Sequence, residues 1–95
     1  MSTKVKPQQE MTLNFHTDPG HGWLEVPKAF AKLVLRAKYS QISCFSYMQG
    51  GMLFLEEDCD APLFVEACRI EGINVKYETQ HKDETPIRQY DGFMV

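Results

Sequence analysis

Apolar and polar residues alternate with a period of two at residues 11–16 and again at residues 73–79. Alternation of this kind is typical of a half-buried β-strand. In the first segment it places Met11, Leu13 and Phe15 on the inner face. The pattern therefore predicts one strand near the start and one in the second half of the chain.

Two further apolar runs, residues 42–48 and 52–56, are separated by a short turn that contains Gly50 and Gly51. Consecutive glycines favour a type I′ hairpin, because both central residues of that turn need a positive φ. In the second run, odd-numbered and even-numbered positions are both apolar. We therefore expect it to be a central strand that is covered on both faces.

Residues 27–38 have apolar side chains three and four positions apart, which predicts an amphipathic helix. Its expected buried positions are Phe30, Leu33, Val34 and Ala37. The basic residues of this segment are Lys28, Lys32, Arg36 and Lys38. A basic stripe suits phosphate contacts, but the chain has a formal net charge of −3, whereas nucleic-acid modules are normally basic. We therefore favour the interpretation of the stripe as the solvated face of the helix over a nucleic-acid contact, which stays the third hypothesis.

Residues 61–71 are predicted to form a second helix, with Asp60 as its N-cap and Gly72 as its C-terminal stop. Its buried stripe is expected to be Leu63, Phe64, Ala67 and Cys68. Four carboxylates lie at the start of this helix, namely Glu56, Glu57, Asp58 and Asp60. A cap and the helix dipole need only one or two acids. The surplus predicts a solvated loop, a divalent-cation site or a contact for a basic partner.

These elements follow one another in the order β-α-β-β-α-β, and residues 86–93 add a short edge strand or an ordered tail. The order is typical of a two-layer α+β domain of the ferredoxin-like type, in which an antiparallel sheet carries both helices on one face. A chain of 95 residues suits one domain. We assign residues 11–95 to it and the polar residues 1–10 to a flexible N-terminal arm.

The three cysteines fit no zinc-binding pattern, and their odd number favours a reducing compartment. Cys44 and Cys68 lie in apolar runs and are expected to be buried, whereas Cys59 lies between two aspartates and is expected to be accessible. No secretory signal and no membrane-spanning run is recognisable. We therefore expect a cytoplasmic protein that needs no cofactor.

Residues 16–26 hold two of the three histidines and the only tryptophan. His16, Asp18 and His21 are residue types that bind zinc or iron, and metal binding through them is one interpretation. A Pro-Gly turn separates them, however, so their geometry is not fixed. In the other interpretation Asp18 stabilises the turn, and the glycines beside His21 let Trp23 pack over the sheet.

The C-terminal segment carries apolar and charged residues that are unusual for a disordered tail. Ile87 and Phe93 flank a run that contains Arg88, Tyr90 and Asp91. We expect Arg88 to pair with the acidic block at residues 56–60 through a bidentate contact, because a guanidinium matches a carboxylate in geometry. Such a pair would hold the tail against the body of the protein.

Four blocks of the chain resemble a family of small uncharacterised proteins that phages, plasmids and other mobile elements encode. They are His21-Gly22-Trp23-Leu24, Tyr47, Leu55-Glu56-Glu57-Asp58-Cys59-Asp60-Ala61 and Ile87-Arg88-Gln89-Tyr90-Asp91. The chain departs from the family at its hairpin, where Gln49-Gly50-Gly51 lacks a charged residue beside the glycine. The resemblance implies a bacterial host and assigns no activity.

The sequence contains no recognisable catalytic constellation, and we therefore expect a non-enzymatic phage or mobile-element protein that binds a host protein with a basic surface. A host defence complex is one candidate, which would make the chain an inhibitor of the anti-CRISPR type. The expected binding residues are His21, Trp23, Glu56, Glu57, Asp58, Asp60, Arg88 and Tyr90. The alternative is a metal-binding module or a small metal-dependent enzyme that uses His16, Asp18 and His21. Opposite charge patches would also allow a homodimer.

Overall fold

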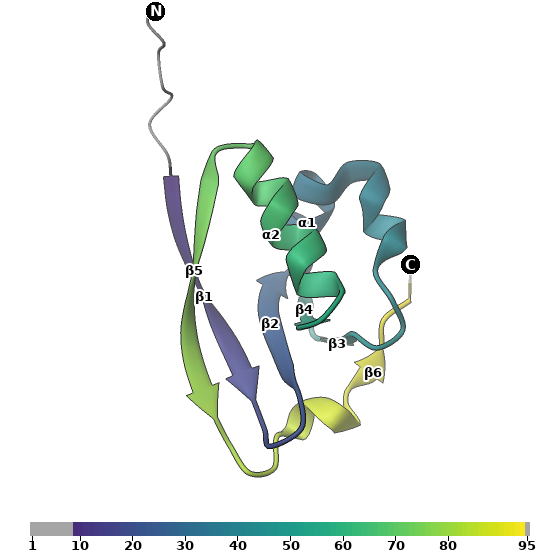
Figure 1. Cartoon of the computed structure of the whole chain (residues 1–95). Helices are drawn as coiled ribbons and strands as arrows, with labels where there is room; N and C mark the ends of the chain where they lie inside the picture. The colour runs from purple at the N-terminus through teal and green to yellow at the C-terminus, as the bar shows by residue number, and fades with distance from the viewer. Residues whose placement is uncertain (1–8, 95) are drawn as a thin grey trace, which may run out of the picture.

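The computed structural model describes residues 9–94, which form one six-stranded sheet and two α-helices (Figure 1). The elements in chain order are β1 (Gln9–Thr17), β2 (Gly22–Pro27), α1 (Lys28–Leu35), the 3-10 helix η1 (Arg36–Gln41), β3 (Tyr47–Gln49), β4 (Met52–Glu56), α2 (Asp60–Ile70), β5 (Ile73–His81), the 3-10 helix η2 (Pro86–Gln89) and β6 (Asp91–Gly92). The α+β class is confirmed.

The sheet is mixed, with the strand order β5-β1-β2-β4-β3-β6. β1 and β5 run parallel, and the other neighbouring strands are antiparallel. The expectation of a purely antiparallel sheet is therefore wrong, and the ferredoxin-like arrangement is not confirmed. The predicted order omits β2, whose residues Trp23, Leu24 and Val26 are all buried and so do not show simple alternation.

Both helices cover one face of the sheet. Leu24, Val26, Leu53 and Leu55 belong to the same buried cluster as residues of α1 and α2, including Ala31 and Phe64. Side chains that alternate with these point to the opposite face. There Trp23, Phe54 and Ile87 form a second, smaller cluster. The C-terminal segment therefore covers part of the face that the helices leave open.

The first helix is shorter than expected. α1 ends at Leu35 because Arg36 adopts a positive φ of 54°, and the chain continues as η1. The buried face of α1 consists of Ala31, Val34 and Leu35, so Leu33, which we expected to be buried, lies outside that face and is 70% exposed. Ala37, another expected core residue, is exposed, while Leu35 and Tyr39 are buried.

The predicted strand at residues 42–48 is also shortened, because only Tyr47–Gln49 forms a strand. The preceding residues make a turn, and Cys44, which we expected to be buried, is exposed. The glycine predictions are confirmed: Gly50 and Gly51 have φ values of 54° and 81°, and Gly72 after α2 has a φ of 81°.

The boundary of the expected N-terminal arm differs slightly from the structure. Gln9 and Glu10, which we assigned to the arm, belong to β1. Residues 1–8 lie outside the described residues. Within residues 9–94, no helix is long and apolar enough to cross a membrane.

Candidate functional site

A hollow of about 340 Å³ lies where the β1–β2 loop, the turn before β3, the β4–α2 loop and η2 meet. Its lining residues come from all four segments and are His21, Trp23, Cys44, Phe45, Tyr47, Glu56, Asp58, Cys59 and Arg88. Five of them, His21, Trp23, Glu56, Asp58 and Arg88, are expected binding residues. The structure therefore brings together residues that lie up to 67 positions apart in the sequence.

Trp23 is the central packed side chain of this hollow. It is only 2% exposed, because β2 lies between β1 and β4 and the tail covers its outer face. The His21 ring stacks beside it at 5.9 Å between ring centres. The Tyr47 ring meets it edge-on at 6.2 Å, and the Arg88 guanidinium carbon lies 5.3 Å from its centre. The wall of the hollow is therefore aromatic, with one cation placed over it.

Arg88 fixes the tail to the β1–β2 loop and not to the acidic block, which corrects our expectation. Its Nε donates to Asp18 Oδ2 at 2.7 Å, and its Nη2 donates to Asp18 Oδ1 at 3.1 Å and to His21 Nδ1 at 2.9 Å. Because a guanidinium can only donate, neutral His21 accepts through Nδ1 and carries its proton on Nε2. Figure 1 shows the tail passing the loop between β1 and β2.

Asp18 organises the loop itself, as the turn interpretation predicts. Its Oδ1 accepts the backbone N–H groups of Gly20 at 2.9 Å and His21 at 2.8 Å. The hydrogen bond from Arg88 and these two N–H groups hold the pKa of the Asp18 carboxyl well below its usual range. The same pair raises the pKa of Arg88.

Acidification is expected to release the tail from this loop. The pKa of Asp18 is lower in the folded protein than in the unfolded chain, so its stabilising contribution is present above about pH 4 and is lost as the pH falls below that value. The free energy that holds the tail should therefore decrease as the pH falls below about 4, and Trp23 fluorescence, which senses the overlying Arg88, should change as the pH approaches the lowered pKa of Asp18. The Arg88→Ala variant should lack this transition, and an unchanged transition in that variant would contradict the assignment.

Two of the four acidic residues in the block, Glu56 and Asp60, are buried and accept hydrogen bonds from other residues of the chain. Glu56 is 7% exposed and accepts the N–H groups of Asp58 and Cys59, each at 2.9 Å. It therefore fixes the β4–α2 loop beside the hollow. Among the acids of this block, only Glu57 and Asp58 are exposed.

Asp60 is not the N-cap that we expected. It is the first residue of α2, it is 2% exposed, and its carboxylate accepts hydrogen bonds from the turn before β3. The donors are Ser43 N at 3.0 Å, Ser43 Oγ at 2.6 Å and Ser46 Oγ at 2.5 Å. Asp60 thus positions Cys44 and Phe45, which line the hollow, and does not itself face it.

The geometry does not favour the metal interpretation of the histidine loop. His16 Nε2 lies 2.6 Å from Glu25 Oε1, and Asp18 and His21 are both engaged by Arg88. Across residues 9–94, no group of three His, Cys, Asp or Glu side chains is placed to hold a metal ion.

Tyr90, which we expected to be a binding residue, lies apart from the hollow around Trp23. Its ring packs on Phe54 at 5.1 Å between ring centres.

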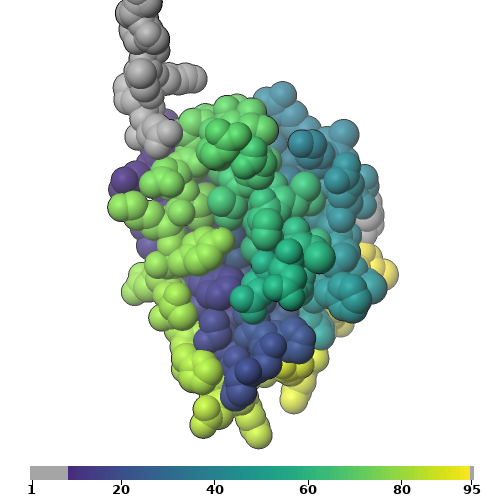
Figure 2. Space-filling view, in the orientation of Figure 1, coloured from purple at the N-terminus to yellow at the C-terminus, as the bar shows by residue number. Residues whose placement is uncertain are grey.

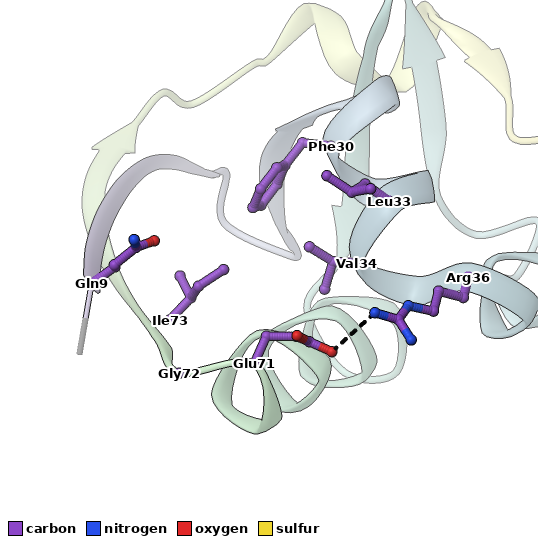
Figure 3. Close-up of a pocket in the computed structure, with 8 residues that line it drawn as sticks. All are labelled: Gln9, Phe30, Leu33, Val34, Arg36, Glu71, Gly72 and Ile73. Atoms are coloured by element: carbon purple, nitrogen blue, oxygen red, sulfur yellow. Dashed lines mark ion pairs between the residues drawn. The ribbon is translucent and has the colours of Figure 1, made fainter. Parts of the chain in front are cut away.

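A second hollow, of about 250 Å³, lies between α1 and the α2–β5 connection (Figure 3). Its walls are mostly apolar side chains, including Phe30, Leu33 and Ile73, and an ion pair of 3.5 Å joins Arg36 to Glu71 beside it. On the same helix, Lys32 of the basic stripe does not line this hollow, and its Nζ lies 5.5 Å from the centre of the Tyr39 ring. This hollow holds few converging polar groups, so it is the weaker candidate.

Sequence reasoning missed four residues that line the first hollow: Cys44, Phe45, Tyr47 and Cys59. Phe45 is 67% exposed although it lies in an apolar run. The signal was present in Ser43 and Ser46, because two serines in such a run interrupt a buried strand.

Comparison of the chain with protein-family models, with curated proteins and with solved structures gives no match.

Proposed function

We propose that this chain is a small non-enzymatic protein of a phage or mobile element that binds a host protein through the hollow around Trp23. The observation that carries the proposal is the exposed aromatic ring of Phe45, 67% exposed, at the rim of a hollow whose wall is Trp23 and Tyr47. Exposed aromatic residues beside a preformed concave site are typical of binding surfaces. The internal hydrogen bonds of Asp18, Glu56 and Asp60 keep that site preformed.

The charges beside the hollow favour a basic partner. Glu57 and Asp58 are exposed, and no ion pair engages either of them among the described residues. Arg88 does not offset them, because its charge is paired with Asp18. A lysine or arginine of the partner would contact these carboxylates at the rim while apolar side chains contact Phe45. A nucleic-acid-binding complex of bacterial defence is one class of protein with such a surface.

The chemistry of the hollow supports binding more than catalysis. A nucleophilic thiol needs a base within hydrogen-bond reach. Within residues 9–94, no hydrogen bond joins His21 to Cys44 or Cys59, and His21 Nδ1 is already engaged by Arg88. Glu56, a buried acid of the hollow, accepts the backbone N–H groups of Asp58 and Cys59 and so fixes the β4–α2 loop.

Affinity capture from a bacterial host lysate tests this proposal. The bait proteins are the wild type, Phe45→Ala, the double reversal Glu57→Lys with Asp58→Lys, and a charge-matched control. The control reverses Asp83 and Glu84, which are exposed and do not line the hollow. Mass spectrometry should find a protein that the wild type and the control retain and that both hollow variants lose by about tenfold or more.

Equal capture by all four baits would place the binding surface elsewhere and overturn the proposal. Capture of nothing above bare resin, in a lysate of a host that carries the element, would also overturn it. Far-ultraviolet circular dichroism of each bait shows that the variants are folded.

A further inference from the structure

β5 is a long strand at the edge of the sheet. Its nine residues pair with β1 on one side, and the strand order leaves its other side without a neighbour among the described residues. Figure 1 shows β5 crossing β1, with the C-terminal half of β5 at the boundary of the molecule, and the strand order makes β5 the outermost strand of the sheet. Figure 2 shows the residues of β5 at the surface on this side of the molecule. An open edge of this length presents a row of backbone donors and acceptors that a further strand satisfies.

The backbone hydrogen bonds identify which residues of β5 face outward. Lys82 N donates to Thr17 O at 2.9 Å, and Gln9 N donates to Gly72 O at 3.0 Å. Even-numbered positions along β5 therefore direct their N–H and C=O groups toward β1. Because these groups alternate along a strand, the odd-numbered positions direct theirs outward. These positions are Ile73, Val75, Tyr77, Thr79 and His81.

The sequence of β5 is complementary to itself around Tyr77. In an antiparallel pair of two β5 strands centred there, Lys76 of each copy lies opposite Glu78 of the other. The same register places Val75 opposite Thr79, and Asn74 opposite Gln80. Opposite charges and polar amides are favourable cross-strand partners. We propose that two copies of this chain pair through the outer edges of β5 in this register and form one continuous sheet.

The hydrogen-bond pattern agrees with this register. Tyr77 faces outward, so two copies of it exchange both of their backbone hydrogen bonds, and the outward-facing Val75 and Thr79 do the same. Lys76 and Glu78 then occupy non-hydrogen-bonded positions, where side chains approach most closely. Lys76 lies 3.4 Å from Glu10 of its own chain, and Glu78 has no ion pair within residues 9–94.

The side chains on the helix-facing side also suit a pairing. The Tyr77 ring stacks on Phe15 at 5.0 Å between ring centres and is still 47% exposed. Across the two-fold axis, two Tyr77 rings would lie side by side and cover each other. The hollow around Trp23 is lined by residues of the β1–β2 loop, β2, the turn before β3, β3, β4, the β4–α2 loop and η2, and by none of β5. The pairing therefore leaves the hollow open and is independent of the proposed function.

Charge reversal at two positions tests the pairing. The substitution Glu78→Lys puts a lysine opposite Lys76 of the second copy, and Lys76→Glu puts a glutamate opposite Glu78. Sedimentation velocity at concentrations on the order of 100 μM should show a wild-type dimer. Each variant alone should dissociate about tenfold more readily or more, because both symmetric pairs become repulsive.

A mixture of the two variants is the decisive measurement. In a homodimer of Glu78→Lys both cross-strand pairs at these positions join two lysines, and in a homodimer of Lys76→Glu both join two glutamates. In a heterodimer of the two variants both pairs join a lysine to a glutamate. The substituted lysine of one copy meets the native Lys76 position of the other, which now carries a glutamate, so that pair is attractive. The remaining pair joins the native Lys76 of the first copy to the native Glu78 of the second and is attractive as well. The mixture should therefore dimerise about as readily as the wild type, whereas each variant alone dissociates about tenfold more readily or more.

Three results would each overturn the pairing: a monomeric wild type, a single variant that dimerises as the wild type does, or a mixture that stays monomeric. A cooperative thermal unfolding transition of Glu78→Lys, an exposed position, shows that the variant is folded.

Discussion

Trp23→Ala is expected to lower the free energy of unfolding by about 4 kcal/mol, the largest effect of any residue in the hollow. Trp23 is 2% exposed and packs with Phe54 and Ile87 in the cluster that attaches the tail to the sheet. Truncation leaves a cavity in that cluster and removes the surface on which Arg88 lies. Denaturant unfolding measures the loss, and limited proteolysis should show earlier cleavage within residues 82–94.

His21→Ala is the matched control for this variant. The His21 ring stacks on Trp23 from outside and is exposed, so its removal opens no buried cavity. We expect a change within about 1 kcal/mol. A cost for Trp23→Ala that is no larger than the cost for His21→Ala would show that the tail is not packed on the indole.

Asp60→Ala is expected to destabilise the fold by about 3 kcal/mol. The Asp60 carboxylate is 2% exposed and accepts from Ser43 N, Ser43 Oγ and Ser46 Oγ. Without it these donors have no acceptor there. The turn that holds Cys44 and Phe45 would lose its anchor to α2. Denaturant unfolding measures the stability, and the rate of Cys44 alkylation measures the order of the turn.

Asp58→Ala, two positions away in the same acidic block, provides the comparison. Its side chain is exposed, and we expect a change in stability within about 0.5 kcal/mol. If Asp58→Ala were as costly as Asp60→Ala, the acids of this block would not divide into structural and exposed groups.

Features of the fold that depend on local backbone conformation could be predicted from the sequence. The positive φ values of Gly50, Gly51 and Gly72 follow from residue type, because these turns exclude most side chains. The register of the second helix follows from its apolar spacing, and Phe64 and Cys68 are buried as expected.

Features that depend on distant partners could not be predicted. The predicted burial of Leu33 was wrong because packing against the sheet and α2 buries Ala31, Val34 and Leu35 instead. The end of α1 was also not predicted, since the residue type of Arg36 gives no sign of a positive φ. Charge complementarity indicated that Arg88 forms an ion pair with an acidic residue. Several acidic residues of the chain are equally suitable by charge, and only the structure identifies Asp18 as the partner. In the same way, the sequence of the acidic block gives no sign that the carboxylates of Glu56 and Asp60 accept hydrogen bonds from within the chain and fix its loops.

The alkylation rates of Cys44 and Cys59 test most directly whether the hollow around Trp23 is the binding surface. Both thiols are exposed and line the hollow, whereas Cys68 is buried, which raises the pKa of its thiol to about 11 and makes it an unreactive internal reference. With the captured host protein bound at saturation, alkylation of Cys44 and Cys59 by N-ethylmaleimide should slow by about tenfold or more. Unchanged rates at both cysteines under saturation would contradict the account.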